Sequence, residues 1–208
     1  MPQATTVQLA WPDTSRATLI ESLDDPLPSV WLYGAGHVGQ ALARVLGTLP
    51  VRTTWIDSRS ELLPDACGAS IEKRIAGHPE NTVSQAPSHT HFIVMTHDHA
   101  LDYKLCRLAL ERGDSASVGV IGSKSKAARF RSRLARDGVL PGRLARLRCP
   151  IGIEGLKSKL PAVIAVAVAA ELLQAVEARA SQASNSSAAV DCDANGACGS
   201  CDVRHRAS

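Results

Sequence analysis

The sequence predicts an α/β fold with a doubly wound, mostly parallel sheet. Three observations predict it. Short apolar runs of strand type alternate with segments of helical periodicity, a glycine motif separates the first such run from the first helix, and an acidic residue ends the second strand. The chain has 208 residues, 45% of them hydrophobic, which suits one domain of ordinary size with extensions at its ends.

The first β-α-β unit spans residues 30–57, VWLYGAGHVGQALARVLGTLPVRTTWID. Residues 30–33 form an apolar strand, a G-x-G-x-x-G turn follows at once, and an amphipathic helix runs to Pro50. In such a turn Gly34 permits the tight bend, Gly36 lets the backbone approach a phosphate, and Gly39 lets the helix pack closely on the strand. The helix N-terminus attracts anions, so the turn is a Rossmann-like anion site. Its candidate contacts are Gly34, Gly36, His37, Val38 and Gly39.

Asp57 ends the second strand, where Rossmann folds hold a ribose hydroxyl. It is therefore a further candidate cofactor contact. Arg59 follows two residues later, so the sequence does not discriminate between NAD and NADP. The alternative is a glycine turn that only packs a helix on a strand and binds no ligand.

The remaining pattern continues the alternation. We expect a third strand at residues 69–75, a short helix at 79–85, a fourth strand at 91–95 with a helix ending at Gly113, and a fifth strand at 117–121. A short strand should precede Cys149. A long apolar helix over 161–180 should close the domain and bury Val163, Val166, Ala167, Ala170 and Leu173. A short helix over residues 14–23 is expected within an N-terminal arm.

A dense group of ionisable residues follows the fourth strand, at the sheet edge where open α/β folds bind ligands. The candidates are His97, Asp98, His99 and Asp102. The two histidines with Asp102 suit a metal, and His97 with Asp98 suits proton transfer near neutral pH. The alternative is a helix cap beside solvated histidines. Replacing Asp102 by Ala should matter only if this group contacts a ligand.

The segment GSKSK, residues 122–126, opens the next helix and forms a second candidate anion site from Gly122, Ser123, Lys124 and Lys126. It is not a P-loop, and the alternative is a serine-capped surface helix. Residues 124–148 carry a net charge of +8, so the rest of the chain, at a total of +3, carries −5. This segregation suits a solvated basic helix face, a partner, an anionic cofactor or a nucleic acid. With Phe130 as its only aromatic residue, the segment argues against nucleic acid.

The C-terminal residues 181–208 have the composition of a flexible tail. The tail contains Cys192, Cys198, Cys201 and His205, whose side chains are suited to zinc; free thiols and a thiol role in sulfur transfer are the alternatives. No secretory signal opens the chain, and its longest apolar run, residues 160–170, is too short to span a bilayer. We therefore expect a soluble, cytoplasmic protein with no membrane partner.

Four motifs in this order, YGAGHVGQALA, THDHALD, IGSKSK and CPIGIEGLKSKLPAVIAVAVAAELL, resemble the C-terminal Rossmann-like domain of the xanthine dehydrogenase accessory protein (XdhC/CoxI) family. The resemblance implies a chaperone that binds the molybdenum cofactor (molybdopterin), protects it while a cysteine desulfurase supports its sulfuration, and inserts it into the molybdenum subunit of xanthine dehydrogenase. It also implies that the four motifs, including Pro150 and Gly152, line one cleft. Homodimerisation is a further expectation.

We thus predict an N-terminal arm (1–29), a Rossmann-like domain (30–180) and a tail (181–208). The leading hypothesis is an accessory factor without turnover of its own. Two other hypotheses stay open. One is a NAD(P)-dependent oxidoreductase with Asp57 at the ribose and His97 or His99 as proton donor; the other is a metal-binding interaction module carried by the tail.

Overall fold

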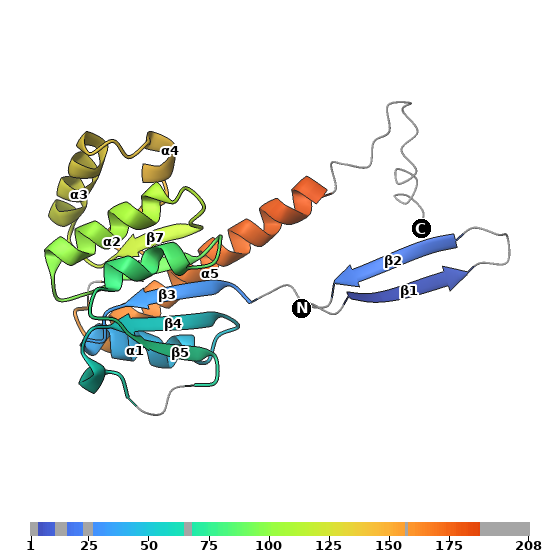
Figure 1. The fold of residues 1–208 in the computed structure, drawn as a ribbon, viewed down its shortest axis with the longest axis horizontal. Coiled ribbons are helices and arrows are strands. Elements are labelled where there is room, and N and C mark those ends of the chain that lie inside the picture. The colour runs from blue at the N-terminus through green and yellow to red at the C-terminus, as the bar shows by residue number, and fades with distance from the viewer. Residues whose placement is uncertain (1–3, 11–15, 23–26, 65–67, 157, 188–208) are drawn as a thin grey trace.

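The computed structural model describes residues 4–10, 16–22, 27–64, 68–156 and 158–187. Its main sheet has six strands, all parallel, in the order β5-β4-β3-β6-β7-β8 (Figure 1). This order confirms the doubly wound Rossmann-like fold. The strands are β3 (Ser29–Tyr33), β4 (Arg52–Asp57), β5 (Ile71–Ile75), β6 (His91–Val94), β7 (Ser117–Val120) and β8 (Leu147–Arg148).

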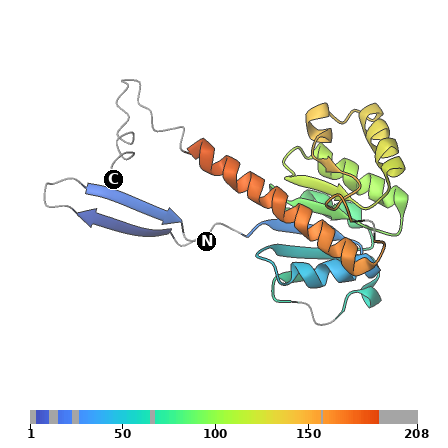
Figure 2. The same ribbon diagram turned by 180° about the vertical axis from the view of Figure 1, so that it is seen from behind.

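Helices cover both faces of the sheet (Figures 1 and 2). One face packs against η2 (Pro79–Gln85, a 3-10 helix), α2 (His99–Glu111), α3 (Lys124–Arg136) and the short α4 (Pro141–Leu144). The other packs against α1 (His37–Leu46) and α5 (Pro161–Ser187), and a 3-10 turn, η1 (Ser60–Leu62), follows β4. Each face has its own apolar core, so the central strands are buried on both sides.

The order of the chain reverses between β3 and β6. Strands β4 and β5 extend the sheet to one side of β3, whereas β6, β7 and β8 extend it to the other. The loops after β3 and β6 therefore leave the sheet in opposite directions and open a crevice between them. The glycine turn follows β3 and the THDH segment follows β6, so two of the predicted motifs flank this crevice.

The prediction of a helix over residues 14–23 is wrong. Within the described residues, β1 (Ala4–Ala10) and β2 (Arg16–Ser22) pair as an antiparallel hairpin that forms a second, two-stranded sheet. The sequences ATTVQLA and RATLIES contain β-branched residues at positions 5–7, 18 and 20, which favour strands over helices. Asp13 and Thr14, residue types that often cap helices and so favoured a helix start here, instead precede β2 in the sequence.

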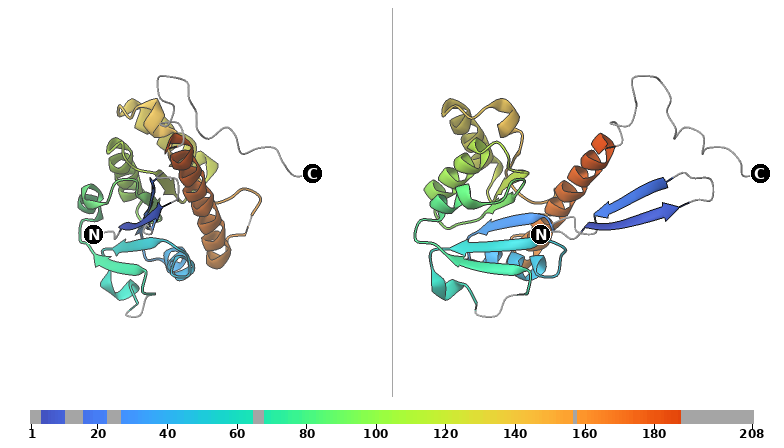
Figure 3. Two further views of the ribbon diagram at one scale, coloured as in Figure 1. Left: turned by 90° about the vertical axis from the view of Figure 1, so that its right-hand side faces the viewer. Right: turned by 45° about the vertical axis from the view of Figure 1, so that its right-hand side comes forward.

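The buried face of α5 also differs from the prediction. Val166, expected inside, is 54% exposed, while Ala165, Val168 and Leu172 pack against the core that α1 shares. The apolar residues occupy more of the helix circumference than one face, so the sequence pattern did not decide which face is buried. The helix is also longer than expected, and it continues past the edge of the sheet (Figure 3). Its stretch Pro161–Ser181 is long and apolar enough to cross a membrane, with 28% of the residues buried in the fold.

Candidate functional site

The structure explains the three glycines of the turn after β3 in different ways. Gly34 has a φ of +112°, and a Cβ there would lie 2.4 Å from the Met95 carbonyl oxygen. A Cβ on Gly39 would lie 2.1 Å from the carbonyl oxygen of Gly34. These two positions therefore need glycine for the bend and for helix packing, as predicted. Gly36 is different, because a Cβ there would meet no atom within 4 Å.

The space beside Gly36 lies at the N-terminus of α1. Gly36 is the N-cap residue, and within the described part of the chain no side chain caps this helix and no acidic residue occupies its first turn. The first N–H groups of the helix, including those of His37 and Val38, thus face an open position with a positive helix-dipole end. The arrangement is that of a site for a small anion.

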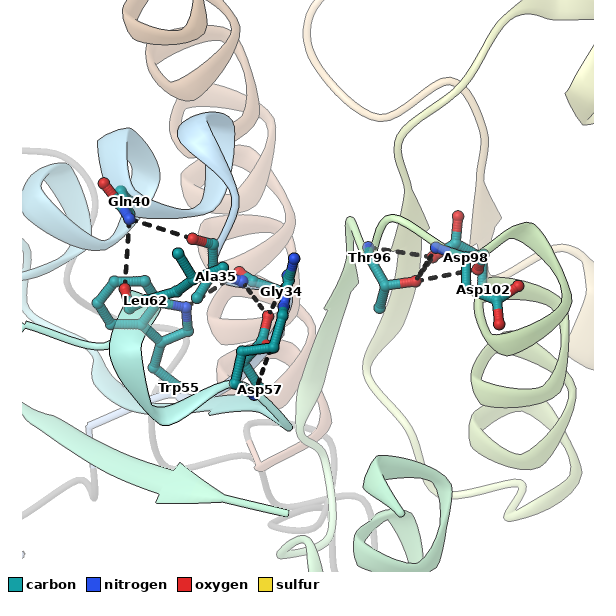
Figure 4. A network of polar contacts seen from close by, with 10 residues as sticks. Gly34, Ala35, Gln40, Trp55, Asp57, Leu62, Thr96, Asp98 and Asp102 are labelled. Atoms are coloured by element: carbon teal, nitrogen blue, oxygen red, sulfur yellow. Dashed lines mark hydrogen bonds and ion pairs between the residues drawn. The ribbon is translucent and has the colours of Figure 1, made fainter. Parts of the chain in front are cut away.

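Three buried or half-buried side chains hold the turn in place (Figure 4). The indole Nε1 of Trp55 donates to the Gly34 carbonyl (3.0 Å), the Ala35 N–H donates to Asp57 Oδ2 (2.6 Å), and Gln40 Nε2 donates to the Ala35 carbonyl (3.2 Å). Neither Trp55 nor Gln40 was predicted from the sequence. A signal existed for Trp55, because a tryptophan in a buried strand must find an acceptor for its N–H.

Asp57 lies beside the glycine turn, as its position predicted, but its carboxylate is already bonded within the chain. Arg59 donates to it from its backbone N–H (2.9 Å) and, through Nε and an Nη atom, to both oxygens at 2.9 Å. Burial alone raises the pKa of Asp57, but hydrogen bonds from Arg59 and Ala35 outweigh it and hold this pKa below its ordinary value. Asp57 is 5% exposed, so its oxygens serve the turn rather than a free ligand position.

The THDH segment builds a second polar network around Asp102 (Figure 4). Asp98 caps α2 by accepting from the N–H groups of Ala100 (2.7 Å) and Leu101 (3.4 Å). The Thr96 hydroxyl (2.7 Å) and N–H (3.1 Å) both donate to Asp102 Oδ1. Asp98 and Asp102 thus fix the start of α2, which is the helix-cap alternative of the sequence analysis.

Lys126 joins this network to the GSKSK segment. Its Nζ donates to Asp102 Oδ2 (2.6 Å) and to the Ile121 carbonyl (2.9 Å), and it lies 5.1 Å from the Phe130 ring centroid. A Cβ on Gly122 would lie 2.7 Å from Lys126 Cδ, so the glycine leaves room for the lysine to fold back. Both charged side chains are buried. The loops after β6 and β7 are therefore tied together by one ion pair.

The histidines lie outside this buried network. His99 is 85% exposed, with its Nδ1 3.9 Å from Asp102 Oδ2, and His97 is exposed beside a small hollow that Gly34, Asp57 and Thr96 also line. Among the residues that the structure describes, no three His, Cys, Asp or Glu side chains are grouped to hold a metal. The metal site considered as one alternative for these histidines lacks a free Asp102 ligand in this part of the chain, because Thr96 and Lys126 bind the oxygens of Asp102.

A cavity of about 990 Å³ opens between α2 and α3. Thr96, Ser123 and Lys126 line its inner end at the carboxyl edge of the sheet, where Ser123 also caps α3 by accepting from the Lys126 N–H (3.2 Å). Thr96 borders both this cavity and the hollow beside Gly34. The THDH and GSKSK segments thus line one cavity, whereas Gly34 of the glycine turn lines a separate hollow that shares Thr96 with it.

The fourth motif lies elsewhere. The Ile151 N–H donates to the Val120 carbonyl (3.1 Å), and the Gly152 N–H donates to Glu171 of α5. Gly152 has a φ of +115°, and a Cβ there would contact Ala167. Pro150 and Gly152 therefore place α5 against the sheet and are not among the residues that line the α2–α3 cavity.

Comparisons with known proteins now decide the family. A family model described as the XdhC Rossmann domain matches residues 30–172, more than half of the chain. The chain belongs to the XdhC family. A crystal structure of a xanthine dehydrogenase from Bacillus halodurans resembles this XdhC domain with a TM-score of 0.63 at 22% identity, over 79% of this chain and 46% of that one. At this identity the likeness shows the fold, and the chain matches less than half of that structure's length. No curated protein matches.

Part of the basic charge of the XdhC domain serves its own backbone. Arg131 donates to the carbonyls of Leu144 and Leu147, Arg143 to that of Glu111, and Arg146 to those of Gly113 and Ser115. These contacts tie α3 and α4 to the end of α2. With Lys126, which donates to the Ile121 carbonyl, four of the nine basic residues in the charged segment therefore bind carbonyl oxygens, an explanation that charge counting alone did not reveal.

The six cysteines of the XdhC chain divide into those inside and those outside the described residues, and Cys67 is among the latter. The tail residues Cys192, Cys198, Cys201 and His205 lie outside the described residues, so the metal and thiol hypotheses for them stay predictions. Cys106 and Cys149 are free and buried in the core. Burial raises the pKa of both thiols, which makes them poor nucleophiles in the folded protein.

Proposed function

We propose that this XdhC-family chain binds the molybdenum cofactor at the carboxyl edge of its sheet and serves as an accessory factor for xanthine dehydrogenase. One observation carries the proposal. Among the described residues no contact requires glycine at position 36, and Gly36 lies at the N-terminus of an uncapped helix with no acid in its first turn. Such a position leaves the backbone N–H groups accessible to a group outside the chain, and an anion fits it.

The cofactor carries a phosphate, and the site is suited to binding that phosphate. The N–H groups of His37, Val38 and Gly39 would hold it, with the open space at Gly36 admitting it to the backbone. Gly122, Ser123 and Lys124 offer a second anion position at the start of α3, beside the cavity that Thr96 shares with the glycine turn. The bound cofactor supplies the redox-active metal for the enzyme that receives it, and the residues here only bind and shield it.

The arrangement gives less support to a nicotinamide-dependent enzyme. Asp57, the residue for a ribose hydroxyl, already accepts hydrogen bonds from Arg59 and Ala35. His97 and His99, the candidate proton donors, are exposed to water. Proton transfer in enzymes is promoted by positioned groups that are shielded from solvent. A binding role without turnover therefore fits these residues better.

The proposal extends to partners and location. The molybdenum subunit of xanthine dehydrogenase would receive the cofactor, a cysteine desulfurase would equip it with sulfur while it is bound here, and the protein would work in the cytoplasm as a soluble factor. A homodimer is part of the same proposal, since α5 leaves Val166 and neighbouring apolar residues exposed.

The test is equilibrium binding of purified protein to molybdenum cofactor under anaerobic conditions, with NAD and NADP titrated in parallel. Gly36→Val should weaken cofactor binding by about tenfold or more, which is about 1.4 kcal/mol. Gly77→Val is the matched control, because a Cβ at Gly77 also meets no atom within 4 Å but lies in the turn after β5. Equal binding by both variants would remove the glycine turn from the site. Binding of nicotinamide nucleotides alone would overturn the proposal.

A further inference from the structure

The cavity between α2 and α3 continues outward as an open groove, which we call the α2–α3 groove. Side chains bridge the two helices beneath it: Tyr103 donates to Asp137 (2.7 Å), and its ring meets that of Phe130 edge-on at 5.4 Å. Figure 1 shows α3 at the margin of the fold, away from β3, β4 and β5. The groove is lined by Thr96, His99, Ala100, Asp102, Tyr103, Ile121, Gly122, Ser123, Lys126, Ala128, Arg129, Phe130, Ser132, Arg133 and Arg136.

A row of guanidinium groups runs along one wall. Arg129, Arg133 and Arg136 are spaced i, i+4, i+7 on α3, so they share one helix face in a row about 10 Å long at 1.5 Å per residue. Arg133 lies over the Tyr103 ring at 4.0 Å and 4.0 Å from Asp137. Arg129 and Arg136 are exposed and, within the described residues, make no hydrogen bond or ion pair. Arg129 and Arg136 are thus without a direct partner among the described residues, although the charge of Arg136 helps to lower the pKa of Asp137.

The remaining lining combines apolar side chains, polar side chains such as His99 and Ser132, and one acidic residue. Ala100, Ile121, Ala128 and Phe130 give the groove an apolar floor, and exposed Ala128 sits beside the arginine row. The single acidic side chain of the lining, Asp102, is bound by Lys126 and Thr96. The groove therefore presents net positive charge over an apolar surface, which attracts an acidic, amphipathic partner.

We propose that the α2–α3 groove docks an acidic amphipathic helix of a partner protein. A helix laid between two others fills an apolar groove with its own apolar face. Glutamates at i, i+4 and i+7 of such a helix have the same axial spacing as Arg129, Arg133 and Arg136. Two of the carboxylates then meet the guanidiniums of Arg129 and Arg136, and the third faces Arg133, which already contacts Tyr103 and Asp137.

This inference goes beyond the proposed function, because docking needs no bound cofactor. Its position nevertheless bears on that function. The inner end of the groove is formed by Thr96, Ser123 and Lys126, which border the proposed cofactor position. A partner docked on α3 is therefore held next to the mouth of the cofactor site.

The probe is a fluorescent helical peptide of about 15 residues, long enough to form helix, with Glu at i, i+4 and i+7 and Leu on the adjacent face. A second peptide carries Gln for each Glu. Fluorescence anisotropy at low salt should show binding of the acidic peptide to the full chain and binding at least about tenfold weaker for the Gln peptide. Arg129→Gln/Arg136→Gln should weaken binding of the acidic peptide by a similar factor, since neither arginine bonds within the fold.

Two matched controls separate docking from general charge. Arg44→Gln/Arg52→Gln removes the same charge from exposed arginines on and after α1 and should leave binding unchanged. Ala128→Glu should abolish binding by placing a carboxylate on the groove floor, whereas Ala135→Glu, at an exposed site of the same helix outside the groove, should preserve it. The proposal would be overturned if the two double arginine variants lost peptide affinity equally, or if Ala128→Glu left peptide binding unchanged. The proposal would also be overturned if single-stranded RNA or anionic phospholipid vesicles displaced the peptide from the wild-type protein and bound the Ala128→Glu variant equally well.

Discussion

Lys126 Nζ lies 2.6 Å from Asp102 Oδ2, and both side chains are almost fully buried, at 9% and 1% exposure. The pair links α2 to the start of α3, while Thr96 and the Ile121 carbonyl complete its hydrogen bonds. Removing two charges from water is costly, so each charge depends on the other for compensation. The pair thus fixes the relative position of two loops that border the proposed cofactor site.

Breaking this pair from one side should destabilise the protein. Asp102→Asn leaves the Lys126 ammonium buried without its counter-charge, and we expect a loss of about 3–5 kcal/mol in the free energy of unfolding. Lys126→Met should cost a similar amount. The double variant should lose less than the sum of the two, because it leaves no lone charge. Urea denaturation of the four proteins measures this cycle, and strictly additive losses would contradict a direct pair.

A loss of stability in Asp102→Asn would correct the role that the sequence predicted for Asp102. Asp102 was expected to matter only through a ligand of the histidine group, whereas the structure gives it a partner 24 residues away on another helix. His99→Ala is a suitable control, since His99 is 85% exposed and touches Asp102 only at 3.9 Å. Its free energy of unfolding should stay close to that of the wild type.

The glycines of the turn should separate into structural and ligand-related positions. Gly39→Ala pushes a Cβ against the Gly34 carbonyl oxygen, where helix and strand backbones cannot move apart freely, and should cost about 1–3 kcal/mol or more. Gly36→Ala meets open space and should cost less than about 1 kcal/mol, the usual range for an N-cap change. Chemical denaturation of both variants checks the order. Equal losses would mean that the space at Gly36 is not free in solution.

The fold was predictable from the sequence because its signals are local. The apolar run before Gly34, the helical periodicity after Gly39 and the strand ending at Asp57 each lie within a short window, and all appear where expected. The N-terminal hairpin was missed because cap residues before β2 imitate a helix start. The buried face of α5 was missed because alanine and valine surround the helix on most sides.

The site was predictable only as a set of segments. The motifs indicated Asp102 and Lys126 as separate candidate residues. Their contact depends on how α2 and α3 cross the sheet, and no spacing in the sequence encodes that arrangement. Trp55 and Gln40 were missed for the same reason, since their acceptors lie on the glycine turn. Asp57 was placed correctly, yet the reach of Arg59 back to its carboxylate depends on the local backbone after β4.

The two core cysteines should resist modification in the folded protein. Burial raises the pKa of Cys106 and Cys149, and Cys106 is fully buried, so little thiolate is present or accessible. Iodoacetamide at pH 8 should label both slowly in native conditions and rapidly in urea. Peptide mass spectrometry resolves each site, and rapid native labelling of Cys106 would show that α2 opens readily.

His91 should make the protein lose stability in mild acid. Burial, with a smaller effect of the Arg179 charge, lowers the pKa of His91 from 6.5 to about 4, and its Nδ1 bonds with the Ser117 hydroxyl at 2.8 Å. Above pH 6.5 the ring is neutral in both folded and unfolded states, so the full stability is present. As the pH falls from 6.5 towards 4, the unfolded chain gains a proton that folded His91 does not accept, which costs up to about 3 kcal/mol at 1.36 kcal/mol per pKa unit. Urea unfolding at several pH values should show this decline in the wild type and in His99→Gln, and a smaller decline in His91→Asn. An identical pH dependence in all three proteins would show that His91 is protonated without cost, and hence that β6 is less shielded from water than its 2% exposure implies.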